Sequence, residues 1–130
     1  MRGLMALVAA LVLSGVVSAQ ATVNFPTEDG GVVFADVYGT GERAVVLTHG
    51  GRFNKESWAK QAPALVHAGF EVMAIDFRGR GKSHGPGGME ASDEELEMDV
   101  IAAVRYLHAQ GAKSVSIVGG SMGGLSLIHI

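Results

Sequence analysis

The stretch Ser114–Gly124 reads Ser-Val-Ser-Ile-Val-Gly-Gly-Ser-Met-Gly-Gly and decides the fold. Its four strand-like residues, Val115–Val118, predict a strand, and the residues that follow fit the pattern G-x-S-x-G in the strand, turn and helix context that this pattern requires. Presenting a serine at the end of a strand takes a sharp backbone reversal, which the flanking residues Gly119 and Gly123 permit. The N-terminus of the following helix would favour an oxyanion. We therefore interpret Ser121 as a candidate nucleophile; the alternative is a glycine-rich turn that only packs tightly.

Length and composition restrict the class of protein. The chain has 130 residues and is 48% hydrophobic, which is enough for one globular domain at most. A formal net charge of -3 provides no field that would gather nucleic acid. Because there is no cysteine, the sequence excludes disulfides, thiolate metal sites and a cysteine nucleophile. We expect no nucleic-acid partner, no metal and no cofactor.

The N-terminus has the pattern of a secretory signal peptide. Arg2 precedes the apolar run 4–17, which is too short to span a bilayer of about 30 Å, and small residues such as Ala19 follow at the cleavage positions. We predict a signal peptide over residues 1–19, export to the periplasm or the medium, and a domain over residues 20–130. A buried N-terminal helix or an uncleaved anchor is the alternative.

Three further segments are typical of strands. Residues 23–41 carry short apolar runs between glycine-rich turns and predict a hairpin or meander that caps a sheet edge. Ala44–Thr48 is a continuous apolar run, as in a parallel sheet covered by helices on both faces, and Phe70–Ile75 is predicted to be the next buried strand. Together with the strand before Ser121, they predict an α/β fold with a mostly parallel sheet and right-handed crossovers.

Two helices are expected between these strands. Asn54 can cap a helix that begins near Lys55, has Trp58 as a packing residue, is broken near Pro63 and ends at Gly69.

The second helix begins with a capping box at Ser92–Glu95 and ends at Gly111. Its apolar stripe runs from Leu96 to Leu107. The acidic residues between Glu90 and Asp99 do not require a metal, because we place them mostly on the solvent face.

The loop His49-Gly50-Gly51 follows the first buried strand. Glycines there let the backbone approach a ligand, so we expect this loop to supply an oxyanion-hole N–H, from Gly51 or, as the less favoured choice, Arg52. His49 has two interpretations. It is either a catalytic base that reaches the serine or, as we favour, a residue that orients the loop.

The loop after the second buried strand is rich in glycine and basic residues. Arg78, Arg80 and Lys82 could meet an anionic substrate, but basic residues in an exposed loop are usually solvated, and this is the interpretation we favour.

These motifs together resemble the α/β-hydrolase family. The resemblance covers about Val32 to Gly124 and rests on His49-Gly50-Gly51, on the D-x-R-G-x-G-x-S pattern that begins at Asp76, and on G-x-S-x-G, in the order of the family. It implies Ser121 as nucleophile, with oxyanion N–H donors from Met122 and from the residue after His49-Gly50. The implied reaction is transfer of an acyl group from an ester, thioester or amide to water.

The chain departs from this family where the remaining catalytic groups are expected. The family places the acid and the histidine after the serine, and Asp76 and Asp99 precede it. His129 lies eight residues on, about 12 Å along a helix axis, which is too far.

We therefore expect the N-terminal half of a longer parent protein, inactive alone, with the outer edge of its last strand uncovered. Residues 125–130 are an unusual continuation of the last helix, and one interpretation is that they are an artefact. For the parent we keep three hypotheses: an esterase-like serine hydrolase acting on a small acyl substrate, a peptidase of the same fold, and a non-catalytic binding module.

Overall fold

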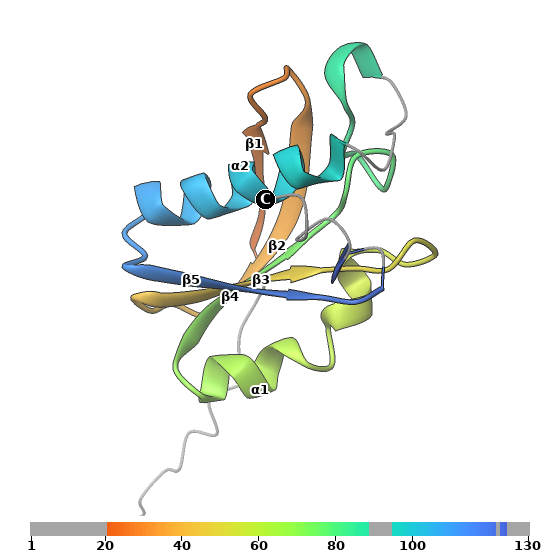
Figure 1. Cartoon of the computed structure of the whole chain (residues 1–130). Coiled ribbons are helices and arrows are strands. Elements are labelled where there is room, and N and C mark those ends of the chain that lie inside the picture. Colours follow the sequence, from red (N-terminus) through yellow and green to blue (C-terminus); the bar gives the residue numbers. More distant parts are fainter. Residues whose placement is uncertain (1–20, 89–94, 122, 125–130) are drawn as a thin grey trace, which may run out of the picture.

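The computed structural model describes residues 21–88, 95–121 and 123–124. It shows a five-stranded sheet with helix α2 on one face and helix α1 on the other (Figure 1). The signal-peptide prediction, most of the predicted capping box, Met122 and the interpretation of residues 125–130 lie outside the described residues. None of the helices in the described ranges is long and apolar enough to cross a membrane.

The sheet is antiparallel at one end and parallel at the other. Its spatial order is β1-β2-β4-β3-β5; β1 pairs with β2 and β2 with β4 in antiparallel register, whereas β3 runs parallel to both β4 and β5. The predicted hairpin at the sheet edge and the predicted parallel strands are therefore both confirmed. The strands are β1 (Ala21–Pro26), β2 (Val32–Tyr38), β3 (Arg43–Thr48), β4 (Phe70–Ile75) and β5 (Ser114–Gly119).

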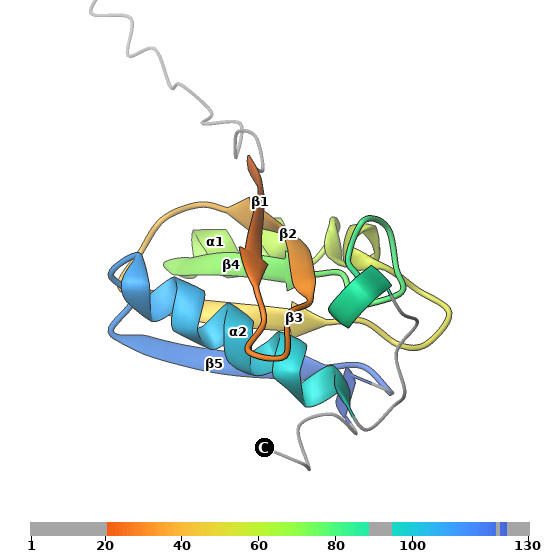
Figure 2. The same cartoon turned by 90° about the horizontal axis from the view of Figure 1, so that it is seen from above.

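The central strands are buried on both faces, as predicted for a parallel sheet covered by helices. On β3 and β4, Val46 and Met73 join the core under α2, while Val45 and Val72 join the core under α1. Seen from above, the sheet separates the two helices (Figure 2). These two cores fix the carboxyl ends of the parallel strands, where the loops of interest begin.

The helices begin and end close to where the sequence predicts. The first helical segment is broken into the 3-10 turn η1 (Lys55–Trp58) and α1 (Ala62–His67), with Pro63 in the first turn of α1, where its missing N–H costs nothing. α2 (Leu96–Ala109) ends just before Gly111, whose φ is 107°. A second short turn, η2, spans Pro86–Gly88.

Strand β5 lies at the sheet edge. Val115 and Ile117 pack against the core under α2, whereas Val118 on the opposite face is 45% exposed. Within the described ranges, β3 is the one strand that pairs with β5. This part of the structure agrees with the expectation of an uncovered outer edge.

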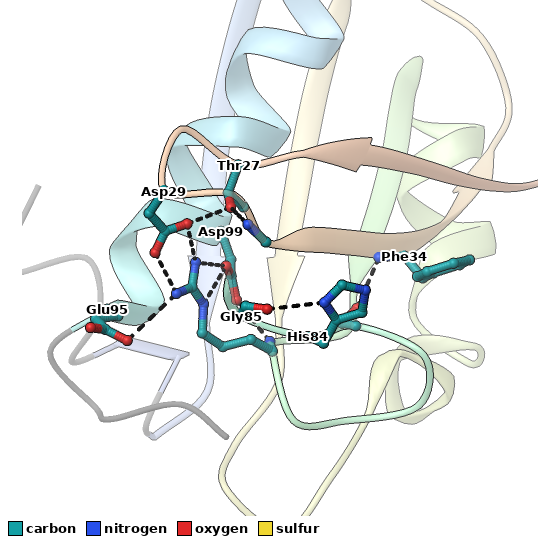
Figure 3. Close-up of polar contacts among 10 residues, drawn as sticks. Thr27, Asp29, Phe34, His84, Gly85, Glu95 and Asp99 are labelled. Atoms are coloured by element: carbon teal, nitrogen blue, oxygen red, sulfur yellow. Dashed lines mark hydrogen bonds and ion pairs between the residues drawn. The ribbon is translucent and has the colours of Figure 1, made fainter. Parts of the chain in front are cut away.

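The expectation that Arg78 is solvated or faces a substrate is wrong. Its side chain is completely buried and donates to Asp99 Oδ1 at 2.9 Å through Nε and to Asp29 Oδ2 at 2.7 Å through Nη1. Asp29, Asp99 and the more distant Glu95 surround it (Figure 3). A buried guanidinium needs such partners because an unpaired charge is costly away from water.

Asp99 is the second correction. The acids between Glu90 and Asp99 are predicted to lie mostly on the solvent face of the helix, but Asp99 is fully buried and also accepts the backbone N–H of Arg78 at 2.8 Å. The hydrogen bonds from Arg78 lower the pKa of Asp29 to about 2, so Asp29 remains ionised at neutral pH. This ion-pair network ties the β1–β2 turn and α2 to the loop after β4.

Candidate active site

Ser121 sits on a strained turn directly after β5. Its φ is 52°, and it is the one non-glycine residue with a positive φ in the described ranges. The residue is exposed, and helical residues follow at Gly123 and Gly124. The strand, turn and helix context predicted from the sequence is therefore present, and the strain at its apex is of the kind that accompanies functional sites.

The two flanking glycines are sterically required. A Cβ on Gly119 would lie 2.6 Å from the carbonyl carbon of Gly123, and a Cβ on Gly123 would lie 2.4 Å from Thr48 Oγ1. The turn thus packs directly against the end of β3, where the Gly120 N–H donates to the Thr48 carbonyl at 3.1 Å. Thr48 in turn donates through Oγ1 to the Val118 carbonyl at 3.2 Å.

These contacts predict that one alanine substitution in the turn destabilises the protein and a neighbouring one does not. Gly123→Ala should destabilise the parent protein by about 1 to 3 kcal/mol, because the new methyl group would overlap side-chain and backbone atoms of Thr48. Gly120→Ala is the matched control, since its nearest neighbour would be 3.9 Å away. Urea denaturation measures both changes; equal stability of the two variants would contradict the packing described here.

The loop after β3 lies beside Ser121. A Cβ built on Gly50 would be 3.6 Å from the Cβ of Ser121, and both residues border one cavity of about 280 Å³. The Gly51 N–H has no acceptor within the described part of the chain, as a free oxyanion donor requires. The structure therefore brings together Ser121, His49, Gly50 and the flanking glycines, while Met122, the other predicted donor, lies outside the described residues.

His49 is held in a single neutral tautomer. Its Nδ1 lies 2.8 Å from the Gly50 carbonyl, which can only accept, so Nδ1 carries the proton. Its Nε2 accepts the backbone N–H of Phe77 at 3.1 Å. Burial lowers the pKa of His49 below its ordinary value of 6.5. Because Nε2 has no lone pair left for a serine proton, this arrangement favours the orienting interpretation over the catalytic base.

A pH dependence follows from this arrangement. Protonation of His49 would place an N–H against the Phe77 N–H, and its pKa is lower in the folded state than in the unfolded chain. The unfolded chain then binds more protons just below pH 6.5, so the free energy of unfolding should fall as the pH decreases through that window. Denaturation of the wild type and of His49→Gln between pH 8 and 5 measures how much His49 contributes to the pH dependence of the free energy of unfolding. The same pH dependence in both proteins would refute this contribution.

The loop after β4 braces the His49-Gly50-Gly51 loop from the outside. Besides the Phe77 contact, Arg80 donates to the Gly51 carbonyl, and the Lys55 N–H donates to Asp76 Oδ1 at 2.7 Å. Arg80 and Lys82 are exposed, as predicted for this loop. Burial raises the pKa of Asp76 above its ordinary value. The bracing contacts of Arg80 and Asp76 are not evident from the sequence: Asp76 opens the D-x-R-G-x-G-x-S pattern, which does not reveal its partner, and Arg80 occupies a variable position of that pattern.

Comparison with known proteins identifies the family. The family model described as serine aminopeptidase, S33, matches residues 39–130. The chain belongs to this serine aminopeptidase family of the α/β-hydrolase fold. The family match covers the Ser121 turn, the His49 loop and the loop after β4 that contacts it.

Relatives of this S33 chain include several kinds of hydrolase. The bifunctional epoxide hydrolase 2 of Sus scrofa is 37% identical over 82 residues, which are 63% of this chain and 14% of that protein. Protein phosphatase methylesterase 1 of Mus musculus is 30% identical over 96 residues, covering 72% of this chain and 25% of that protein.

Solved structures agree with the fold. Epoxide hydrolase A from Mycobacterium thermoresistibile has a TM-score of 0.69 and 30% identity, over 84% of this chain and 34% of that one. A Pyrococcus furiosus esterase has a TM-score of 0.75 at 24% identity, over 85% of this chain and 46% of its own, and supports the fold alone. The chain spans less than half the length of each of these proteins.

Proposed function

We propose that the parent protein is a serine hydrolase that cleaves esters or amides through an acyl-enzyme formed on Ser121. The observation that carries this proposal is the exposed, strained Ser121 at the carboxyl end of β5, beside Gly50. Ligands of open α/β sheets bind at this edge. The family membership supports a hydrolase, because the relatives named above are hydrolases.

The proposed reaction has two steps. Ser121 Oγ attacks the substrate carbonyl carbon, its proton passes to a base, and the resulting oxyanion accepts N–H groups from Gly51 and Met122. The alcohol or amine then leaves with a proton, and water hydrolyses the ester on Ser121. We propose that the base and its acid lie in the part of the parent that follows this chain, since His49 is engaged at both ring nitrogens.

The nucleophile distinguishes this proposal from an epoxide hydrolase. If a serine oxygen opened an epoxide, the product would be an ether, and water does not hydrolyse an ether under mild conditions. Attack on a carbonyl instead gives an ester, which turns over. Ser121 therefore favours carbonyl substrates, even though several relatives are named as epoxide hydrolases.

We further propose that residues 1–19 direct export, on the basis of the charge and hydropathy pattern alone. N-terminal sequencing of the mature parent would test this, and a retained Met1 would contradict it.

A fluorophosphonate probe tests the nucleophile in the parent protein. We expect labelling of the wild type at Ser121 and none of Ser121→Ala, as read by peptide mass spectrometry. Failure to label the wild type would favour a non-catalytic binding module.

A further inference from the structure

The cavity beside Ser121 has an aromatic wall. It measures about 280 Å³, and Phe53 and Trp58 border it together with Ser57, Gln61, Gly50 and Ser121. Phe53 and Trp58 come from the segment between β3 and α1, so the wall belongs to this chain.

The backbone of Phe53 is held in place, whereas its side chain is exposed. Its side chain is 61% exposed, which is unusual for so large an apolar group. Its N–H donates to the Gly50 carbonyl at 3.0 Å, and its ring lies 3.3 Å from a Cβ built on Gly50. The phenyl group is therefore positioned at the cavity mouth, where a ligand that covers it would remove apolar surface from water.

Trp58 forms the deeper part of the wall. It packs against the core under α1, and its Cζ2 lies 4.0 Å from a Cβ built on Gly120, the residue before the candidate nucleophile. An apolar group bound along Phe53 and Trp58 would consequently end next to Ser121.

The described wall of this cavity carries no charge. His49 is neutral because both ring nitrogens are engaged, and Ser57 Oγ accepts the Asn54 N–H at 3.3 Å. No aspartate or glutamate borders the cavity in the part of the chain that the structure describes. The described part of the wall therefore offers a substrate only aromatic and uncharged polar groups.

We propose that Phe53 and Trp58 bind the acyl group of the substrate, and that this group is apolar. The proposal rests on the hydrolase function proposed above. A cavity of about 150 Å³ is known to hold benzene, so the larger volume here admits a phenyl ring and its linker.

Ester hydrolysis by the parent protein tests whether the acyl site prefers an apolar group to a charged one. Ethyl isobutyrate and L-alanine ethyl ester differ only in a methyl group against an ammonium group, and a pH-stat measures both. We expect kcat/KM to be at least tenfold higher for ethyl isobutyrate. A preference for the alanine ester would overturn the proposal.

Phe53→Ala tests the wall itself. We expect the ratio of kcat/KM for ethyl phenylacetate over ethyl acetate to fall at least fivefold in Phe53→Ala and to recover in Phe53→Leu, which restores apolar area. Lys60→Ala, an exposed change on the same segment, should leave the ratio unchanged. An unchanged ratio in Phe53→Ala would refute the proposed wall.

The two proposals fail in different ways. If the wild type neither reacts with the fluorophosphonate nor hydrolyses any ester, the hydrolase function fails and the acyl wall fails with it. If it does both but prefers the alanine ester or ignores Phe53→Ala, the acyl wall alone is wrong.

Discussion

Replacing Ser121 with alanine will lower kcat of the parent protein for its best ester substrate by a factor on the order of 10⁶, by analogy with loss of the nucleophile in a serine triad. The reason is that the alanine leaves no oxygen to form the acyl-enzyme. Steady-state assays measure the decrease in kcat, and active-site titration of the wild type gives the concentration of active enzyme.

Ser114→Ala, at an exposed serine on the same strand, is the control and should keep wild-type activity. If Ser121→Ala retains more than about a hundredth of the wild-type kcat, another residue is the nucleophile, because a loss that small lies far below the loss seen in serine triads.

Arg78→Met will have the largest effect on stability. Removing the guanidinium leaves Asp99 buried without its charge partner, and breaking a buried ion pair in this way costs about 3 to 5 kcal/mol. We expect a corresponding decrease in the free energy of unfolding of the parent protein, measured by urea denaturation.

Two further variants serve as controls for Arg78→Met. Arg105→Met removes an exposed ion pair with Glu28 and should cost no more than about 1 kcal/mol. Adding Asp99→Asn to Arg78→Met removes the unpaired charge while keeping an acceptor for the residue 78 N–H, so part of the stability should return. A small effect of Arg78→Met alone would mean that the network in Figure 3 does not stabilise the fold.

The backbone of the fold was predictable because its signals are local. The mostly apolar sequences of β3 and β4 indicate strands buried on both faces, Pro63 marks the break between η1 and α1, and G-x-S-x-G marks the turn at Ser121. Each signal lies within a few residues of the feature that it predicts.

The polar contacts that hold the loops were not predictable in this way. Arg78 and Arg80 are two residues apart in one loop, yet the first is buried and the second exposed, because Arg78 meets Asp29 across a separation of 49 residues. Asp99 did carry a signal that was missed. It lies three residues after Leu96 and four before Ala103, and therefore on the apolar face of α2.

The candidate nucleophile and the His49 loop were predictable from the sequence, but the contacts that hold and line the site were not. The position of His49 before two glycines indicated an orienting role, but its Phe77 partner comes from another strand end. The sequence indicates a packing role for Trp58 and none for Phe53, since sequence spacing cannot reveal that both residues border the cavity at Ser121.

The edge position of β5 bears on how such a protein is made. While the polypeptide is still emerging from the ribosome, this strand would present unpaired N–H and C=O groups to any neighbouring nascent chain. Co-translational protection by a chaperone, or rapid addition of a further strand, would then decide between a productive monomer and intermolecular aggregation.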